Sequence, residues 1–241
     1  MSLKEKNRFK PIFKQLIRLR ENVQNRQKIL KFKKKKWQTF LTFYSYRLKN
    51  YKKFKPLDHT KYFVTKHGTR GMSYKKRFRD TLQAGRKLRI FYGNLLKKYF
   101  KKKIRIAIKK KQSKKRIENT FLNFFETRLD TVLYRAKFAP TVRSAQQLIL
   151  HGKVYVNQVQ VKSKAYHLKS GDVVNLSLDS LNLYENHIIN SIKWSVPPKH
   201  LLINYRTLQI LFLNNLESTN LASEFLFNLK LQKILVNYSK Q

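Results

Sequence analysis

Lysine and arginine are the side chains with which this sequence could do chemistry, and the chemistry they offer is the binding of polyanions. The chain has 241 residues, with 55 Lys and Arg against 12 Asp and Glu, so its formal net charge is +43. Self-repulsion of that size disfavours a compact domain unless a polyanion neutralises it. Nucleic acid is therefore the expected partner. A membrane surface is the alternative, but no apolar run approaches the roughly 20 residues of a spanning helix.

The basic residues concentrate in the first half of the chain. Residues 1–120 hold 41 of the 55 Lys and Arg but only 5 of the 12 Asp and Glu. The densest run, residues 97–117, places twelve Lys and Arg around Ile104, Ile106 and Ile108. A charge run is usually a solvated helix face, but this one contains no acidic residue. Contact with phosphates through counterion release is the better explanation.

Residue patterns typical of enzymes and metal sites do not stand out. The chain has no Cys, which excludes disulfides and thiolate zinc sites. Its six His are scattered without the spacing of metal ligands. We find no Gly-rich phosphate loop, Ser-His-Asp arrangement or pair of carboxylates. The sequence thus predicts a binding protein without catalytic residues, metal or cofactor.

The elements that must position the cations are clearest from residue 121 onwards. Apolar side chains recur there with the 3.6-residue period of one helix face, and Arg128 and Arg135 lie away from that face. The apolar positions are Leu122, Phe125, Leu129, Val132 and Leu133. Pro140 then breaks the helix, because it biases the preceding residue out of the helical region. Thr141 can cap a new helix.

A second short helix and a small sheet follow. The apolar positions of this helix are Val142, Ala145, Leu148 and Ile149. Gly152 is placed to end the helix in the left-handed conformation. Alternating apolar residues predict strands at 154–156 and 159–161, and a third at 173–176 after the turn at residues 170–172.

Short motifs run in order through this segment. They are Arg128-Leu129-Asp130, Tyr134-Arg135, Thr141 with Ala145 and Leu148-Ile149, His151-Gly152, Val154 with Val156-Asn157, and Gly171-Asp172-Val173-Val174. Together they resemble the small RNA-binding domain named after ribosomal small-subunit protein four. The resemblance implies an α+β fold: a basic, mostly helical region plus a small domain of two helices packed on a short antiparallel β-sheet, the αL-type fold. The family usually places Gly after the Asn. Gln158 stands there instead, so the turn is expected to be wider or strained.

The resemblance continues on both sides of this domain. Residues 66–71 resemble a Gln-His-Gly loop that lies on rRNA in the family, and the predicted helix from Tyr74 ends in Arg89-Ile90-Phe91-Tyr92-Gly93, like the family's Arg-x-x-Tyr-Gly. Leu88, Tyr92 and Leu95 are expected on the buried side of that helix, with Arg86, Lys87 and Arg89 on its RNA side. Pro198, Leu201, Ile203-Asn204, Leu208 and Phe212 match a late strand, and 225–241 a closing helix.

These segments predict four parts. Residues 1–63 form a basic extension, partly ordered on RNA, and residues 64–126 a helical rRNA-binding region. Residues 127–178 form the small RNA-binding domain, and 179–241 a C-terminal strand and helix. The predicted RNA-binding residues are His67, Arg70, Arg86, Lys87, Arg89, Lys101, Lys102, Lys103, Arg105, Arg128, Arg135, Arg143, Gln147, His151, Lys153, Asn157, Lys162 and Lys164.

Two other classes of protein carry a similar domain. In one class of pseudouridine synthases, the Asp of Arg-Leu-Asp is catalytic and is soon followed by Thr-Ser-Gly. Here Asp130 is followed by Thr131-Val132-Leu133-Tyr134 on an apolar helix, so we expect a salt-bridge or capping role for it. Free assembly or rescue factors, such as the small heat-shock protein that handles stalled large subunits, lack the helix with Tyr-Gly and the late strand.

The resemblance implies a structural constituent of the small ribosomal subunit rather than an enzyme. Such a protein binds a helix junction in the 5′ domain of small-subunit rRNA and helps to nucleate assembly. It lies where mRNA enters the subunit, beside ribosomal proteins three and five, and is not expected to form homo-oligomers or bind membranes. Heavy use of Lys, Asn, Phe, Tyr and Ile is typical of mitochondrially encoded members. The expected location is therefore the mitochondrial ribosome, on the matrix side.

Overall fold

The computed structural model describes residues 73–109, 114–191, 197–213 and 231–239. It also describes single positions elsewhere, namely Gln15, Leu19, Val23, Lys35, Gln38, Thr39, Thr42, Phe225 and Phe227. The predicted loop at 66–71, with His67 and Arg70, lies outside the described residues, and so does most of the predicted extension at 1–63. Among the described helices, none is long and apolar enough to cross a membrane. The chain divides into two compact units, one of residues 1–96 and 225–240 and one of residues 97–224.

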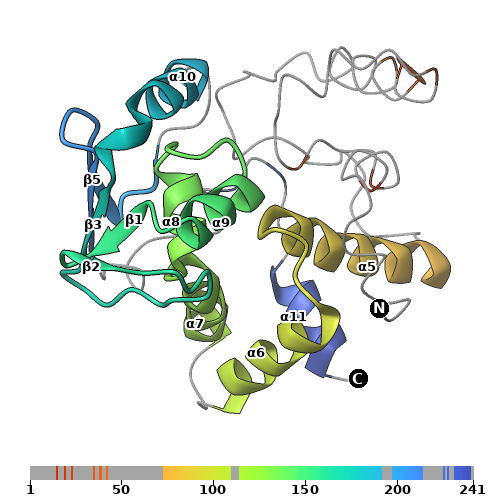
Figure 1. Cartoon of the computed structure of the whole chain (residues 1–241). Coiled ribbons are helices and arrows are strands. Elements are labelled where there is room, and N and C mark those ends of the chain that lie inside the picture. The colour runs from red at the N-terminus through yellow and green to blue at the C-terminus, as the bar shows by residue number, and fades with distance from the viewer. Residues whose placement is uncertain are drawn as a thin grey trace, which may run out of the picture. The chain divides into compact units, whose positions relative to one another are not determined.

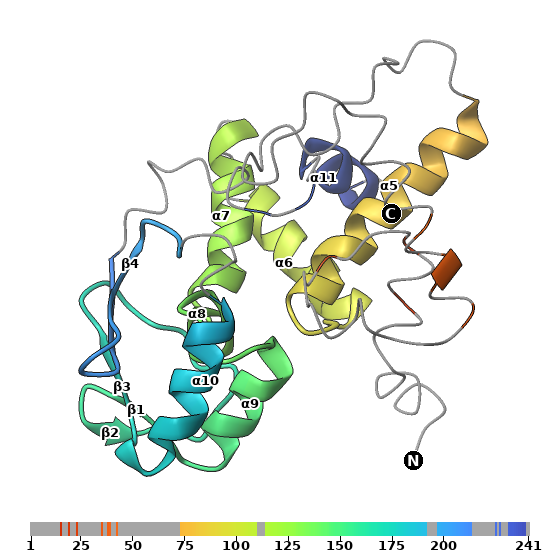
Figure 2. The ribbon, with the colours of Figure 1, turned by 90° about the horizontal axis from the view of Figure 1, so that it is seen from above.

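In the first unit, helix α5 (Tyr74–Phe91) packs against helix α11 (Leu231–Ser239), and the two lie side by side in Figure 2. The predicted helix ending in Tyr-Gly is confirmed, because Gly93 adopts φ 78° directly after the end of α5. Leu88 and Tyr92 are buried as expected, and Leu95 is half-buried. The closing helix begins at Leu231, later than the predicted residue 225. Phe225 and Phe227 instead pack their rings against Phe91, with centroid distances of 5.1 and 5.8 Å.

The second unit begins with two helices that pack through aromatic side chains. Helix α6 (Lys97–Lys109) packs on helix α7 (Lys114–Glu126). The Phe100 ring lies 5.1 Å from Phe121 and 5.6 Å from Phe125, between centroids, and all three side chains are buried. This apolar contact holds α6 against α7, so the basic residues of α6 are carried by a packed helix.

The predicted continuous helix around residues 122–133 is wrong, because it is divided into two. Helix α7 ends at Glu126, and helix α8 (Leu129–Arg135) begins after Arg128, whose backbone is extended at φ −72°, ψ 134°. The break arises because the chain pairs with a distant segment. Leu129 N–H donates to Tyr166 O at 2.9 Å, and Leu168 N–H donates to Thr127 O at 2.8 Å. The apolar stripe still runs unbroken across the junction, since all five predicted positions are buried.

Helix α9 (Val142–Leu150) packs on α8, and a sheet follows (Figure 1). The three predicted strands are confirmed as β1 (Val154–Val156), β2 (Val159–Gln160) and β3 (Val173–Leu176). The predicted single late strand is a hairpin, β4 (Leu201–Asn204) and β5 (Gln209–Phe212). All neighbours pair antiparallel in the order β2-β1-β3-β5-β4, which confirms the α+β class.

One element was not predicted from the sequence. A 3-10 turn (Leu178–Ser180) leads into helix α10 (Leu181–Ser191), the helix drawn after β3 in Figure 1. Asn residues recur along it, and only Tyr184 among its described side chains is buried. Its apolar residues therefore do not form the continuous stripe from which a helix is recognised.

Left-handed backbone positions shape the small domain. Gly152 ends α9 at φ 69°, as predicted, and a Cβ there would meet the Gln160 amide nitrogen at 2.5 Å. Asn157 and Gln158 connect β1 to β2, at φ 49° and 70°. Because Val156 pairs directly with Val159, this is a tight two-residue turn. Two positive φ values are those of a type I′ turn. The turn is thus strained at Gln158 rather than wider.

Candidate nucleic-acid interface

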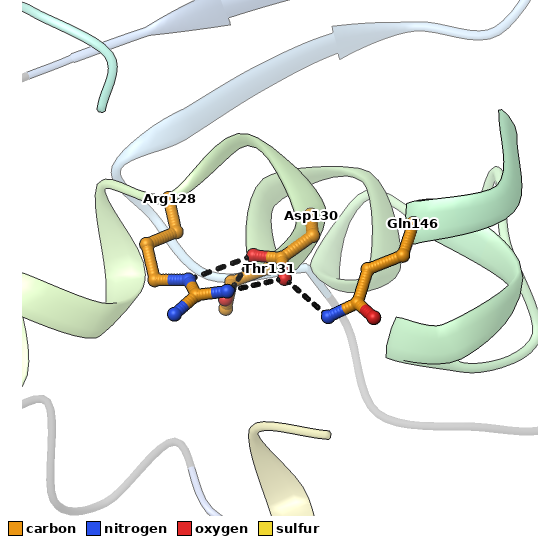
Figure 3. Close-up of polar contacts among 4 residues, drawn as sticks. All are labelled: Arg128, Asp130, Thr131 and Gln146. Atoms are coloured by element: carbon orange, nitrogen blue, oxygen red, sulfur yellow. Dashed lines mark hydrogen bonds and ion pairs between the residues drawn. The ribbon is translucent and has the colours of Figure 1, made fainter. Parts of the chain in front are cut away.

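A buried polar network fixes the start of the small domain. Arg128 donates from Nε to Asp130 Oδ1 at 3.0 Å and from Nη2 to Oδ2 at 2.7 Å. Gln146 of α9 donates its amide to Asp130 Oδ2 at 2.8 Å. Figure 3 shows the Asp130 carboxylate held between Arg128 and Gln146, with Thr131 beside it. Since Asp130 is fully buried, the predicted salt-bridge role of this residue is confirmed.

A second buried ion pair joins α7 to α8. Arg135 donates to Glu126 at 3.1 Å from Nε and at 2.6 Å from Nη2. Arg128 and Arg135 were both predicted to bind RNA, yet they are only 6% and 8% exposed. A guanidinium that is buried and already paired with a carboxylate offers little charge to a phosphate. These two side chains therefore hold the domain together rather than form an open RNA surface.

Helix α9 presents predicted RNA-binding residues along one side. Its cap is confirmed, because Thr141 Oγ1 accepts the N–H of Ser144 at 3.1 Å. Arg143, Gln147 and His151 follow at four-residue intervals, which places them on one helix face. Arg143 is half-buried, and Gln147 and His151 are exposed. The opposite face, with Val142, Ala145 and Ile149, is buried. Leu148 is only half-buried and is not the core residue that we predicted.

The predicted residues of the hairpin divide into two groups. Asn157 closes the turn, because its Oδ1 accepts Val173 N–H at 3.0 Å and its Nδ2 donates to Asp172 at 2.9 Å. That amide is used inside the domain. Lys162 and Lys164 are exposed, and Lys153 is half-buried. Lys162 and Lys164 are therefore open to a ligand, whereas the side chain of Asn157 stabilises the turn.

The predicted cations of α6 and α5 also differ in exposure. On α6, Lys102 and Arg105 are exposed, while Lys101 and Lys103 are half-buried. Lys103 Nζ lies 4.6 Å from the ring centroid of Phe124 and 5.5 Å from that of Tyr99, both cation–π distances. On α5, Arg86 is exposed, and Lys87 and Arg89 are half-buried. Arg89 Nε also donates to Leu95 O at 2.8 Å, which helps to close the end of α5.

Two cationic or titratable residues were missed from the sequence. His167 lies against the α7–α8 junction, where its Nδ1 is 3.0 Å from Thr127 Oγ1. Lys137 follows α8 at φ 69°, and burial, aided by the positive charge of Arg135, lowers its pKa to about 8. No local pattern marks His167, because its partners Thr127 and Arg128 are distant in the sequence. In the described ranges, no group of three or more His, Asp or Glu could hold a metal ion.

Comparison with known proteins agrees with this geometry. Residues 127–174 match the family described as the S4 domain. This segment of the chain is therefore similar to that family. It is also 39% identical over 128 residues to small ribosomal subunit protein uS4 of Brucella anthropi, which covers 53% of this chain and 61% of that relative. The uS4 proteins of Caulobacter vibrioides and Brucella ovis are 38% and 39% identical over the same length, with the same coverage.

The chain thus spans about three fifths of the length of these curated relatives. Within that part, both findings confirm the resemblance to the family of small-subunit protein four that the motifs indicated. The S4 domain match covers α8, α9 and β1 to β2 completely and ends within β3. The buried network of Figure 3 therefore lies inside the segment that matches the S4 domain, as does the exposed side of α9.

Proposed function

We propose that the chain is a structural, non-enzymatic constituent of the small ribosomal subunit and that it binds small-subunit rRNA. The observation that carries this proposal is the S4 domain at residues 127–174, together with its uS4 relatives. The domain neutralises its internal arginines with buried carboxylates and leaves other cations at its surface. A positive surface on a rigid core suits contact with phosphates where RNA helices meet.

The buried position of Asp130 argues against the pseudouridine synthase alternative. A catalytic carboxylate must reach its substrate, but the Asp130 carboxylate has no exposed surface and accepts bonds from Arg128 and Gln146. The assembly or rescue factor remains the second alternative. It differs from a ribosome constituent in when it is bound to the subunit, and this difference can be measured directly.

Gradient sedimentation combined with RNA crosslinking tests the proposal. A constituent should be stoichiometric with mature small subunits and crosslink to small-subunit rRNA. An assembly factor would be found only on precursors, and a modifying enzyme would not co-sediment. Absence from mature small subunits would contradict the proposal.

The finer parts of the proposal come from the family resemblance. They are contact with a helix junction of the 5′ domain, a role early in assembly, and a position beside ribosomal proteins three and five where mRNA enters. We further propose a mitochondrial ribosome, on the matrix side, because the composition is typical of mitochondrially encoded members. The positions of crosslinks on the rRNA test the contact with the 5′ domain, and cell fractionation tests the mitochondrial location.

A further inference from the structure

A group of cations meets where α6 approaches the junction of α7 and α8. We define the junction cluster as Lys103 and His167, with Lys102 next to Lys103 in sequence; the buried Arg128, already paired with Asp130, adds charge nearby but no phosphate contact. The backbone holds one side of it, because Arg128 and His167 form an isolated antiparallel bridge between segments distant in sequence. Two backbone hydrogen bonds flank this bridge, Leu129 N–H to Tyr166 O and Leu168 N–H to Thr127 O. His167 is therefore fixed beside the junction, with its ring partly buried and the rest of the residue open to solvent.

Helix α6 supplies the other side of the junction cluster. The ammonium of Lys103 lies over the ring of Phe124, three residues before Thr127, and near Tyr99 of its own helix. These rings restrict the lysine without neutralising it. Lys102, the next residue along α6, is exposed. Lys103 thus adds positive charge near Arg128, whose guanidinium is already paired with Asp130.

The electrostatics of the junction cluster agree with this geometry. Burial lowers the pKa of His167, and the charges of Lys103 and Arg128 lower it further, while Asp130 opposes them. Burial also lowers the pKa of Lys103, as do the charges of Lys102 and Arg128. The free protein therefore holds a neutral imidazole among cations. An anion placed there would favour the charged form of each group.

The hydrogen bonds also decide which imidazole nitrogen is available. Thr127 Oγ1 donates its single hydrogen to Asn123 O at 2.8 Å. Toward His167 the same hydroxyl can only accept, so the neutral ring carries its hydrogen on Nδ1. Nε2 is then the nitrogen with the free lone pair, and it is the atom that gains a proton.

We propose that the junction cluster binds a backbone phosphate of RNA and that His167 takes up a proton from solvent at Nε2 when the phosphate binds. The proposal rests on the proposed function for the class of ligand, and it adds a defined phosphate site coupled to protonation. The oxygens of the bound phosphate accept hydrogen bonds from the new Nε2–H of His167 and from the ammonium of Lys103. One proton enters the complex, and no covalent bond is made or broken.

The coupling fixes how affinity depends on pH. The pKa of His167 is lowered in the free protein and raised by the phosphate in the complex, so the complex binds more protons. Affinity must then increase as pH falls between those two pKa values and level off outside them. A single linked proton allows at most about a ten-fold change per pH unit.

The test uses the full chain and a small-subunit rRNA transcript at constant ionic strength, from about pH 8 down to about pH 6, around the ordinary imidazole range. The affinity of the parent should rise several-fold as pH falls. His167→Gln should remove that rise while binding at the highest pH changes little. His187→Gln is the matched control, a His of α10 outside residues 127–174, and should keep the rise.

A second measurement does not depend on RNA. Lys103→Gln removes a charge that opposes protonation, so the pKa of His167 in the free variant, followed by NMR, should rise. The proposal is overturned if His167→Gln keeps the pH profile of the parent, if the parent profile is flat, or if Lys103→Gln leaves the imidazole titration unchanged. Failure of the proposed function looks different: the parent would bind an unrelated transcript of equal length as tightly, whatever the pH profile.

Discussion

Gln158 occupies a backbone position that favours glycine. Its φ of 70° in the β1–β2 turn costs a side-chain residue energy that Gly avoids. Gln158→Gly should therefore stabilise the domain by about 1 kcal/mol, measured as the free energy of unfolding in urea. Gln147→Gly, on the exposed side of α9, is the matched control and should destabilise by about 1 kcal/mol. A loss of stability in Gln158→Gly would contradict this account of the turn.

The lowered pKa of Lys137 makes the free energy of unfolding depend on pH in the alkaline range. Its pKa is lowered from 10.5 to about 8, chiefly by burial, so between these values the unfolded chain binds more protons than the folded one. Raising the pH through this window therefore stabilises the fold. The difference in unfolding free energy between Lys137→Met and the parent should favour the variant below pH 8 and shrink as the pH rises. Lys164→Met, at an exposed site, should show a constant difference. A constant difference for Lys137→Met would contradict the lowered pKa.

Arg143 lies at the second position of α9, where helix N–H groups and the helix dipole already favour an anion. Arg143→Glu should weaken binding to small-subunit rRNA roughly ten-fold or more, because it replaces a charge-assisted contact with repulsion. Thermal melts should show the fold intact. Ile149→Asp is the structural counterpart, since it buries a charge at a fully buried site and should unfold the domain. Parent-like binding by Arg143→Glu would instead favour Lys153, Lys162 and Lys164.

At the scale of elements, the Glu126–Arg135 pair holds α7 to α8. Glu126→Gln keeps the shape of the side chain but leaves the buried guanidinium without its charge partner. It should cost about 3–5 kcal/mol, whereas the double change Glu126→Leu with Arg135→Met should be near neutral. Chemical unfolding measures both. Asp179→Asn, at an exposed acid, should stay within about 0.5 kcal/mol. An equally large loss in the double variant would show that the pair itself, rather than its uncompensated half, sets the stability.

The elements predicted correctly are those fixed by nearby residues. The Thr141 cap, the left-handed Gly152 and the alternation in β1 and β3 depend on steric and hydrogen-bonding rules within a few positions. The features that were missed depend on distant partners. The break at Thr127–Arg128 requires Tyr166 and Leu168, and the inward direction of Arg135 requires Glu126. The helical period correctly places Arg135 off the apolar stripe. It cannot show that Glu126 is buried there and pairs with it.

For the whole molecule, charge governs binding. If many Lys and Arg contact phosphates, the logarithm of the rRNA affinity should fall linearly and steeply with the logarithm of the salt concentration. Each lost contact should reduce the slope by about 1. Lys102→Gln, at an exposed cation of α6, should therefore reduce the slope by about that amount, and Gln147→Ala should not. A flat salt dependence of the parent would rule out an interface dominated by phosphates.

The pairing of β3 with β5 has a consequence for how the chain is made. During synthesis, α8, α9 and the β1–β2 turn can form soon after they emerge, because their contacts are close in sequence. One side of β3 meets β1 early, but its other side waits for residues 209–212. Until then one edge of β3 has unpaired N–H and C=O groups that can pair with the wrong strand. The interval in which a nascent chain is most exposed to mispairing therefore ends when Phe212 leaves the exit tunnel.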